Sequence, residues 1–87
     1  MFKLLAKMVD EKNKLLENEL FEFDGFFESD NLYNYMLTIC EKFKIETPIV
    51  LTKHKNHLNE FNFTKFMEQD FVDTINFKSL TVEIVQE

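Results

Sequence analysis

The amino-acid sequence predicts a small two-layer α+β fold, in which one main helix packs against a β-sheet. Apolar residues recur at helical spacing between Ser29 and Phe43, whereas near both ends of the chain they alternate with polar residues, as in half-buried strands. Most of the 11 phenylalanines lie in two clusters that flank the predicted helix, namely Phe21, Phe23, Phe26 and Phe27 before it and Phe61, Phe63, Phe66, Phe71 and Phe77 after it. Because a fully buried phenylalanine contributes about 1.5–3 kcal/mol, these clusters predict the core.

The length and composition predict one compact domain that spans residues 1–87. The content of 45% hydrophobic and 30% charged residues is typical of an ordered soluble globule. A chain of this size buries only about 60–65% of the surface that it exposes when unfolded, which leaves little room for a deep active site. In chain order we expect an N-terminal β-hairpin, the main helix, a central strand, a short helix and a C-terminal strand.

The first 24 residues predict the β-hairpin. Apolar residues alternate with lysines from Phe2 to Met8, the segment from Asp10 to Lys14 is polar and turn-like, and alternation resumes from Leu20 to Phe23. A single amphipathic helix is the alternative, because several leucines in this segment also fit a period of 3.6 residues. We favour the hairpin, since a long helix would break its apolar stripe at Lys12.

The main helix is predicted between Ser29 and Phe43, with Ser29 or Asp30 as its N-cap and Pro48 beyond its end. The segment from Pro48 to Leu51 is apolar on both faces, which predicts the central strand. A short helix is expected from Thr52, as its cap, to Phe61. Residues 63–77 suggest an edge strand and a helical turn near Asp70, and the alternation from Leu80 to Val85 predicts the C-terminal strand.

The composition also indicates the setting of the protein. All ten basic residues are lysines, and glycine, alanine and proline occur once each, which is typical of an AT-rich bacterial or phage genome. The single Cys40 cannot form an internal disulfide, so we expect a cytoplasmic protein. No stretch approaches the ~20 apolar residues of a membrane span, and the first residues do not resemble a signal peptide.

The residues that could carry chemistry are few. His54, His57 and Glu60 have the spacing of metal ligands on one side of a helix, but flanking lysines favour the alternative of two surface histidines. Cys40 lies in the apolar stripe of the main helix, where a thiol is buried and inert. Gly25 is the only glycine, so phosphate-binding loops and oxyanion loops are excluded. We therefore expect no cofactor and no enzymatic activity, with a metal-dependent activity at His54 and His57 as a second alternative.

The distribution of charge along the chain is the basis of a hypothesis about function. The chain has a net charge of −6 and a pI near 4.9, and its acids concentrate in residues 10–30, which disfavours direct nucleic-acid binding. We expect a protein-protein interaction module whose partner is basic or itself binds nucleic acid, with Asp24, Phe26, Phe27, Glu28 and Asp30 as the contact residues. The alternative is an acidic nucleic-acid mimic that inhibits a DNA- or RNA-processing enzyme, as small anti-defence proteins do.

Overall fold

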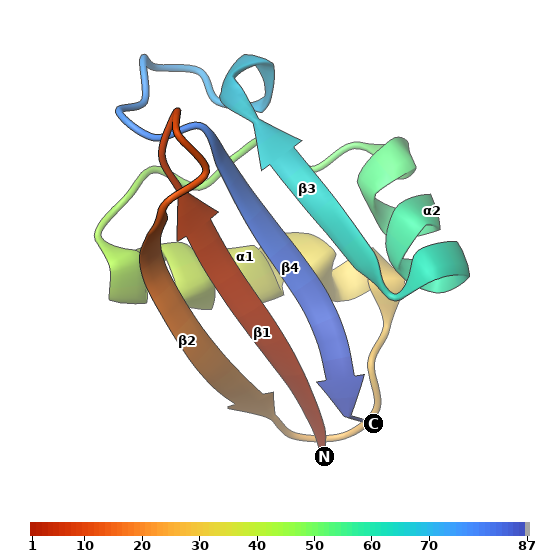
Figure 1. Cartoon of the computed structure of the whole chain (residues 1–87). Helices are drawn as coiled ribbons and strands as arrows, with labels where there is room; N and C mark the ends of the chain where they lie inside the picture. The colour runs from red at the N-terminus through yellow and green to blue at the C-terminus, as the bar shows by residue number, and fades with distance from the viewer. Residues whose placement is uncertain (87) are drawn as a thin grey trace.

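A computed structural model describes residues 1–86, which form a four-stranded antiparallel sheet and two α-helices (Figure 1). The strands are β1 (Phe2–Val9), β2 (Leu15–Phe23), β3 (Phe63–Met67) and β4 (Ser79–Gln86). The helices are α1 (Leu32–Phe43) and α2 (Thr52–Phe61), and two 3₁₀ turns are η1 (Ser29–Asn31) and η2 (Glu68–Asp70). The predicted α+β fold class is confirmed.

The N-terminal hairpin is confirmed. β1 and β2 pair antiparallel from Phe2 opposite Phe23 to Val9 opposite Leu15, with one irregularity next to the turn. In the turn, the side-chain carboxylate of Asp10 accepts backbone N–H bonds from Lys12 and Lys14, both at 2.9 Å. A short acidic side chain that bonds its own following backbone is a common way to stabilise a tight turn. The polar segment between the two strands therefore has a structural role.

The centre of the sheet consists of β1 and β4, and the strand order is β2-β1-β4-β3. The C-terminal strand is confirmed, because Leu80 and Val82 are fully buried while Glu83 is exposed. On β1 the alternation predicted from the sequence buries Phe2, Leu4, Ala6 and Met8 on the same face of the sheet. This inner face, together with the helices that cover it, forms the core.

Helix α1 lies across the inner face of the sheet (Figure 1). It buries Leu32, Tyr35, Met36, Ile39 and Cys40, as the predicted apolar stripe requires. The predicted cap is wrong by one to two residues, because Ser29 and Asp30 belong to the 3₁₀ turn η1 and Asn31 is the N-cap of α1. The helix ends before Pro48, at Lys44, whose left-handed backbone (φ 58°) terminates it.

The predicted central strand from Pro48 to Leu51 is wrong. This segment connects α1 to α2 without joining the sheet. The central positions are occupied by β1 and β4, which pair with each other along most of their length, and a proline cannot donate a ladder hydrogen bond. Pro48 is nevertheless buried, and the Ile49 N–H donates to the Asp70 carbonyl at 2.7 Å. Val50 also packs against the core, whereas Ile49 and Leu51 are almost half exposed.

Helix α2 and the residues after it follow the prediction. The short helix spans Thr52–Phe61, the edge strand is β3, and the helical turn near Asp70 is η2. The cap differs, because Leu51 is the N-cap and its N–H donates 3.0 Å to Nδ1 of His54 in the first turn. Leu58 and His54 are the buried residues of this helix, and the His54 ring stacks on Phe66 of β3.

The second face of the sheet is open, so the architecture has two layers. Leu20, Leu5, Glu83 and Phe63 form a row across the four strands, and Leu20 and Phe63 are each almost half exposed (48% and 45%). Lys3, Lys7 and Lys65 stand on the same face, which keeps it hydrated. Neither helix in residues 1–86 is long and apolar enough to cross a bilayer.

Candidate functional site

The segment from Asp24 to Asp30, which comprises the loop after β2 and the start of η1, contains the residues predicted to contact a partner. Gly25 has a positive φ of 78°, a conformation that side-chain-bearing residues rarely adopt, and it turns the chain after Asp24. Because of this turn, Phe26, Phe27 and Glu28 project from one short segment at the end of β2.

The two adjacent phenylalanines of this loop point in opposite directions. Phe27 is half-buried, and its ring lies 5.7 Å from that of Phe2 and 5.7 Å from that of Tyr35. Phe26 is 81% exposed, more than any other large apolar side chain in residues 1–86. Only Phe26 is therefore free to contact a partner, and Phe27 anchors the loop to the core.

Tyr35 of α1 organises this anchor. Its ring lies 5.1 Å from Phe2, 5.0 Å from Phe23 and 5.7 Å from Phe27, distances at which aromatic pairs attract beyond their buried area. Its hydroxyl oxygen accepts the Glu28 backbone N–H at 3.2 Å. The loop is thus held on both sides of Phe27, so the exposed ring of Phe26 projects from an ordered base.

The three candidate acids are exposed and differ in their contacts. Glu28 accepts a hydrogen bond from the Asn31 side-chain amide at 3.1 Å. Asp30 lies 3.8 Å from the ammonium of Lys55 on α2, and its side chain is 96% exposed, so solvent screens this pair strongly. Asp24 is also exposed. The three carboxylates flank Phe26 in the sequence, and their negative charge is exposed to solvent.

More phenylalanines are exposed to solvent than the sequence predicted. Besides Phe26, Phe61 at the end of α2 is 58% exposed and Phe63 at the start of β3 is 45% exposed. With His57 and Lys65 they line a shallow hollow of about 300 Å³. Both residues sit where the chain passes from helix to open sheet face, a location that residue type alone does not reveal.

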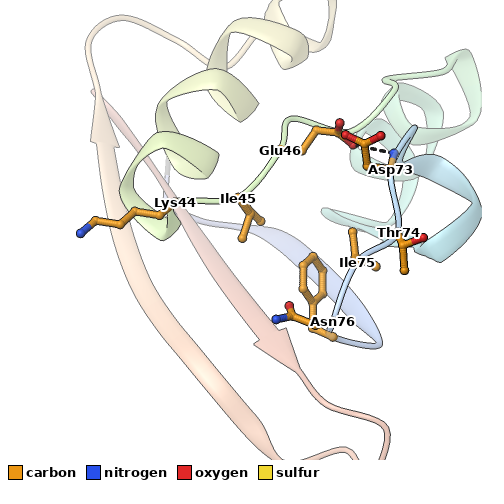
Figure 2. A pocket seen from close by; sticks show the side chains of 8 residues that line it. Lys44, Ile45, Glu46, Asp73, Thr74, Ile75 and Asn76 are labelled. Atoms are coloured by element: carbon orange, nitrogen blue, oxygen red, sulfur yellow. Dashed lines mark hydrogen bonds between the residues drawn. The ribbon is translucent and has the colours of Figure 1, made fainter.

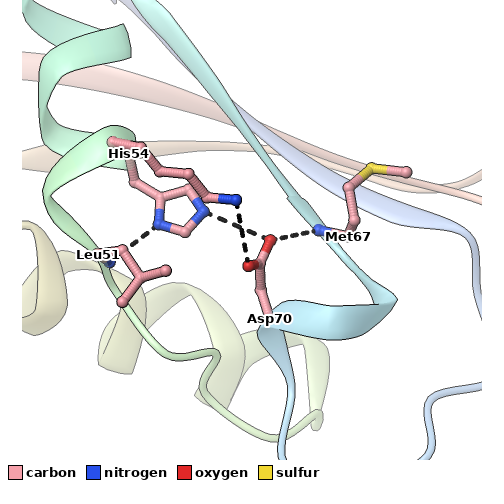
Figure 3. A network of polar contacts seen from close by, with 5 residues as sticks. Leu51, His54, Met67 and Asp70 are labelled. Carbon is pink, nitrogen blue, oxygen red and sulfur yellow. Dashed lines mark hydrogen bonds and ion pairs between the residues drawn. The ribbon is translucent and has the colours of Figure 1, made fainter.

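His54 is fully buried, which corrects the expectation of a surface histidine. Figure 3 shows its ring between the backbone N–H of Leu51 and the carboxylate of Asp70. Nδ1 accepts the Leu51 N–H at 3.0 Å, so Nε2 carries the proton and donates to Asp70 Oδ2 at 3.4 Å. The ring also stacks on Phe66, with centroids 4.2 Å apart.

Burial lowers the pKa of His54 below its usual 6.5, because desolvation disfavours the imidazolium more than Asp70 stabilises it. The Asp70 carboxylate, also buried, accepts the Met67 N–H at 2.9 Å and lies 3.8 Å from the Lys53 ammonium. Both ring nitrogens of His54 are therefore occupied inside the core. A general base needs a nitrogen that can reach substrate, so this pair is a structural clamp.

The proposed metal ligands are not brought together. His54 is buried with both nitrogens engaged, whereas His57 and Glu60 are exposed on α2. Within the described residues 1–86, no three His, Cys, Asp or Glu side chains are grouped as metal ligands. The spacing in the sequence places His54 and His57 on neighbouring parts of a helix, but one of them faces the core and the other faces water.

Cys40 is buried, as predicted from its place in the apolar stripe. Burial raises the pKa of its thiol to about 12, and a hydrogen bond with Thr47 offsets this only in part. Because the thiolate is the reactive form, the side chain is inert near neutral pH.

A second hollow, of about 320 Å³, lies between the end of α1 and the loop that precedes β4 (Figure 2). Glu46 stands at its margin, and its carboxylate accepts the N–H groups of Val72 at 3.1 Å and Asp73 at 3.2 Å. The acidic group at this position is thus engaged in fastening the loop. The remaining lining combines apolar and polar residues, namely Ile45, Ile75 and Phe77 with Lys44, Asp73, Thr74 and Asn76.

No family model, curated protein or solved structure matches this chain.

Proposed function

We propose that the protein is a non-enzymatic interaction module that binds a basic partner protein through the loop from Asp24 to Asp30. The observation that carries the proposal is the 81% exposure of Phe26 at the end of a loop that Phe27 and Tyr35 anchor. A large aromatic side chain gains the most when a partner pocket covers it. A pre-ordered loop also loses less conformational entropy on binding.

The acids next to Phe26 define the charge of the partner. Asp24, Glu28 and Asp30 leave their carboxylates largely in solvent, so they can attract a basic surface and orient it before contact. The absence of enzymatic activity remains part of the proposal. It is supported by the burial of Cys40 and His54, the two side chains best suited to nucleophilic or base catalysis.

The test is a quantitative pull-down from lysate, with the tagged full chain and two variants compared by mass spectrometry. Phe26→Ala should release the retained partner, whereas Val72→Ala should not, because Val72 is also highly exposed (76%) but lies on another loop. Equal retention by both variants would overturn the role of Phe26.

The same experiment separates this proposal from the nucleic-acid mimic. A third variant in the same pull-down, with Asp24, Glu28 and Asp30 neutralised together, should retain moderately less of the partner. A partner held through Phe26 should persist in high salt, because salt screens surface charges but not apolar contacts. If a nucleic-acid enzyme is captured, is lost in high salt and is insensitive to Phe26→Ala, the mimic replaces the present proposal.

A further inference from the structure

The strand β2 has one free edge. In the sheet order β2-β1-β4-β3 it is terminal, and within residues 1–86 it pairs with β1 alone. Figure 1 shows it as the brown arrow at the margin of the sheet, away from α2. It spans nine residues, Leu15–Phe23, and its side chains are all at least partly exposed. A long edge of this kind presents unpaired backbone donors and acceptors.

Two backbone hydrogen bonds identify the groups that point outward. The Asp10 N–H donates to the Lys14 carbonyl at 2.9 Å, so the backbone N–H of Asp10 points toward β2. The Lys78 N–H donates to the Val9 carbonyl at 2.8 Å, so the backbone C=O of Val9 points toward β4. Since backbone groups alternate along a strand, the even-numbered residues of β1 bond to β2 and the odd-numbered ones bond to β4.

The same alternation transfers to β2 through the register. Ala6 lies opposite Glu19 and Leu4 opposite Phe21, so these two residues of β2 bond to β1. The backbone N–H and C=O groups of the residues between and beside them, Asn18, Leu20 and Glu22, therefore point away from the sheet. These are the groups that an added strand would bond.

Charge selects the strand that would fit. From Leu15 to Glu41 the sequence contains no lysine, while β2 alone carries Glu17, Glu19 and Glu22. Glu19 lies 3.6 Å from the Lys42 ammonium in an exposed pair, and Glu22 lies opposite Lys3 on β1. Opposite charges across adjacent strands stabilise a sheet and like charges oppose it. A second copy of β2 would bring an identical acidic strand alongside, so a basic strand is favoured.

Apolar surface on β2 adds to this selection. Leu20 is 48% exposed on the open face, at the end of the row that includes Leu5. On the other face, Phe21 and Phe23 are half-buried at the rim of the core. An added strand would cover all three side chains. Its own side chains must therefore include apolar residues interspersed with basic ones.

We propose that the free edge of β2 docks an extended segment of a partner protein, one that carries lysine or arginine among apolar residues and adds a fifth strand to the sheet. The proposal rests on the proposed interaction function and specifies its partner. The edge runs directly into the loop that carries Phe26, so strand addition and the Phe26 contact can serve one partner.

The test uses the full chain and, as a probe, a short capped peptide of alternating valine and lysine. At low ionic strength, NMR shifts of the backbone amides should concentrate at Asn18, Leu20 and Glu22. Asn18→Pro removes an outward N–H without removing a bond to β1, and proline is tolerated at such edge positions. It should weaken peptide binding at least about tenfold. The matched control Asn18→Ala, which keeps the N–H, should bind normally.

A second variant does not depend on proline. Glu17→Lys combined with Glu22→Lys reverses the charge of the edge, so it should lose the lysine peptide and bind the same peptide with glutamate in place of lysine. Shifts located elsewhere, unchanged binding in Asn18→Pro, or equal binding of both peptides by the native chain would overturn the proposal. A native dimer that Asn18→Pro dissociates would also overturn it, in favour of self-pairing.

The two proposals fail separately. If Phe26→Ala releases the cellular partner but Asn18→Pro has no effect on either partner or peptide, the interaction function stands and strand addition falls. If Asn18→Pro abolishes peptide binding while Phe26→Ala retains every partner, strand addition stands and the role of the loop falls.

Discussion

His54 Nε2 lies 3.4 Å from Asp70 Oδ2, and this contact joins residues 16 positions apart inside the core. The pair links the first turn of α2 to η2, while the Ile49 N–H bonds to the Asp70 carbonyl. Asp70 in η2 therefore contacts both the first turn of α2 and the segment that contains Ile49, which are separate in the sequence. The arrangement makes Asp70 and His54 determinants of stability, and it has measurable consequences.

The first prediction concerns pH. In the unfolded chain His54 takes up a proton near pH 6.5, whereas burial lowers its pKa in the folded chain. The unfolded state therefore binds more protons as the pH falls below 6.5, and the free energy of unfolding decreases. Between about pH 6 and 5 this residue should contribute up to about 1.4 kcal/mol of lost stability per pH unit.

Urea unfolding at a series of pH values measures this effect. His54→Phe, which keeps an aromatic ring against Phe66, should flatten the dependence between pH 7 and 5. His57→Ala, which removes an exposed histidine from the same helix, should leave it as in the native chain. The same slope in all three proteins would contradict the assignment to His54.

The second prediction concerns the Asp70 carboxylate. Asp70→Ala leaves both the His54 Nε2–H and the Met67 N–H without their acceptor. Each buried donor left unsatisfied costs about 1–3 kcal/mol, so the variant should lose at least about 2 kcal/mol of unfolding free energy. Asp73→Ala, which removes an exposed carboxylate nearby, should change stability by less than about 0.5 kcal/mol. Similar values for the two variants in urea unfolding would disprove the clamp.

The third prediction concerns the base of the Phe26 loop. Tyr35→Phe keeps the aromatic cluster but removes the hydroxyl that accepts the Glu28 N–H. We expect a loss of about 1 kcal/mol and faster hydrogen exchange at the Glu28 amide. Tyr33→Phe is the matched control, because Tyr33 is half exposed on the same helix. An unchanged exchange rate at Glu28 in the Tyr35 variant would show that the hydroxyl does not hold the loop.

The fourth prediction concerns Cys40. Its thiol is buried and its pKa is raised to about 12, so the native protein should react with a disulfide reagent only as fast as it unfolds. The rate should rise in step with added denaturant, and the fully unfolded chain should be labelled at once. Rapid labelling of the native protein at pH 8 would mean that α1 opens locally around Cys40.

Both terminal strands and the main helix were predicted correctly because each shows a clear apolar period in the sequence. The alternation from Phe2 to Met8 and from Leu80 to Val85 predicted strands, and the stripe before Phe43 predicted α1. In each case one face of the element is buried and the opposite face is hydrated, so apolar and polar residues recur with the period of that element. The hairpin prediction held against the helix because its polar turn is real.

The segment from Pro48 to Leu51 was wrongly predicted as a strand, because a short apolar run does not by itself indicate pairing in a sheet. Pro48 is buried, but Ile49 and Leu51 are almost half exposed. Whether a segment joins a sheet depends on which strands already occupy the neighbouring positions. Here β1 and β4 do so, and β4 lies far along the chain.

The composition of the chain predicted contact residues between Asp24 and Asp30, including both Phe26 and Phe27, but of these two phenylalanines only Phe26 is highly exposed. Phe27 packs inward against Phe2 and Tyr35, which contact it from distant elements. The free edge of β2 was invisible, because strand order is a property of the assembled sheet.

The type and approximate limits of most elements, and the concentration of acids between residues 10 and 30, could be read from the amino-acid sequence because they depend on near neighbours in the chain. The strand order, the burial of His54 beside Asp70, the exposure of Phe26 and the free edge of β2 became visible only in the folded structure. Each of these depends on contacts between distant segments, whose partners are chosen by packing and by the backbone hydrogen bonds that the whole fold must satisfy.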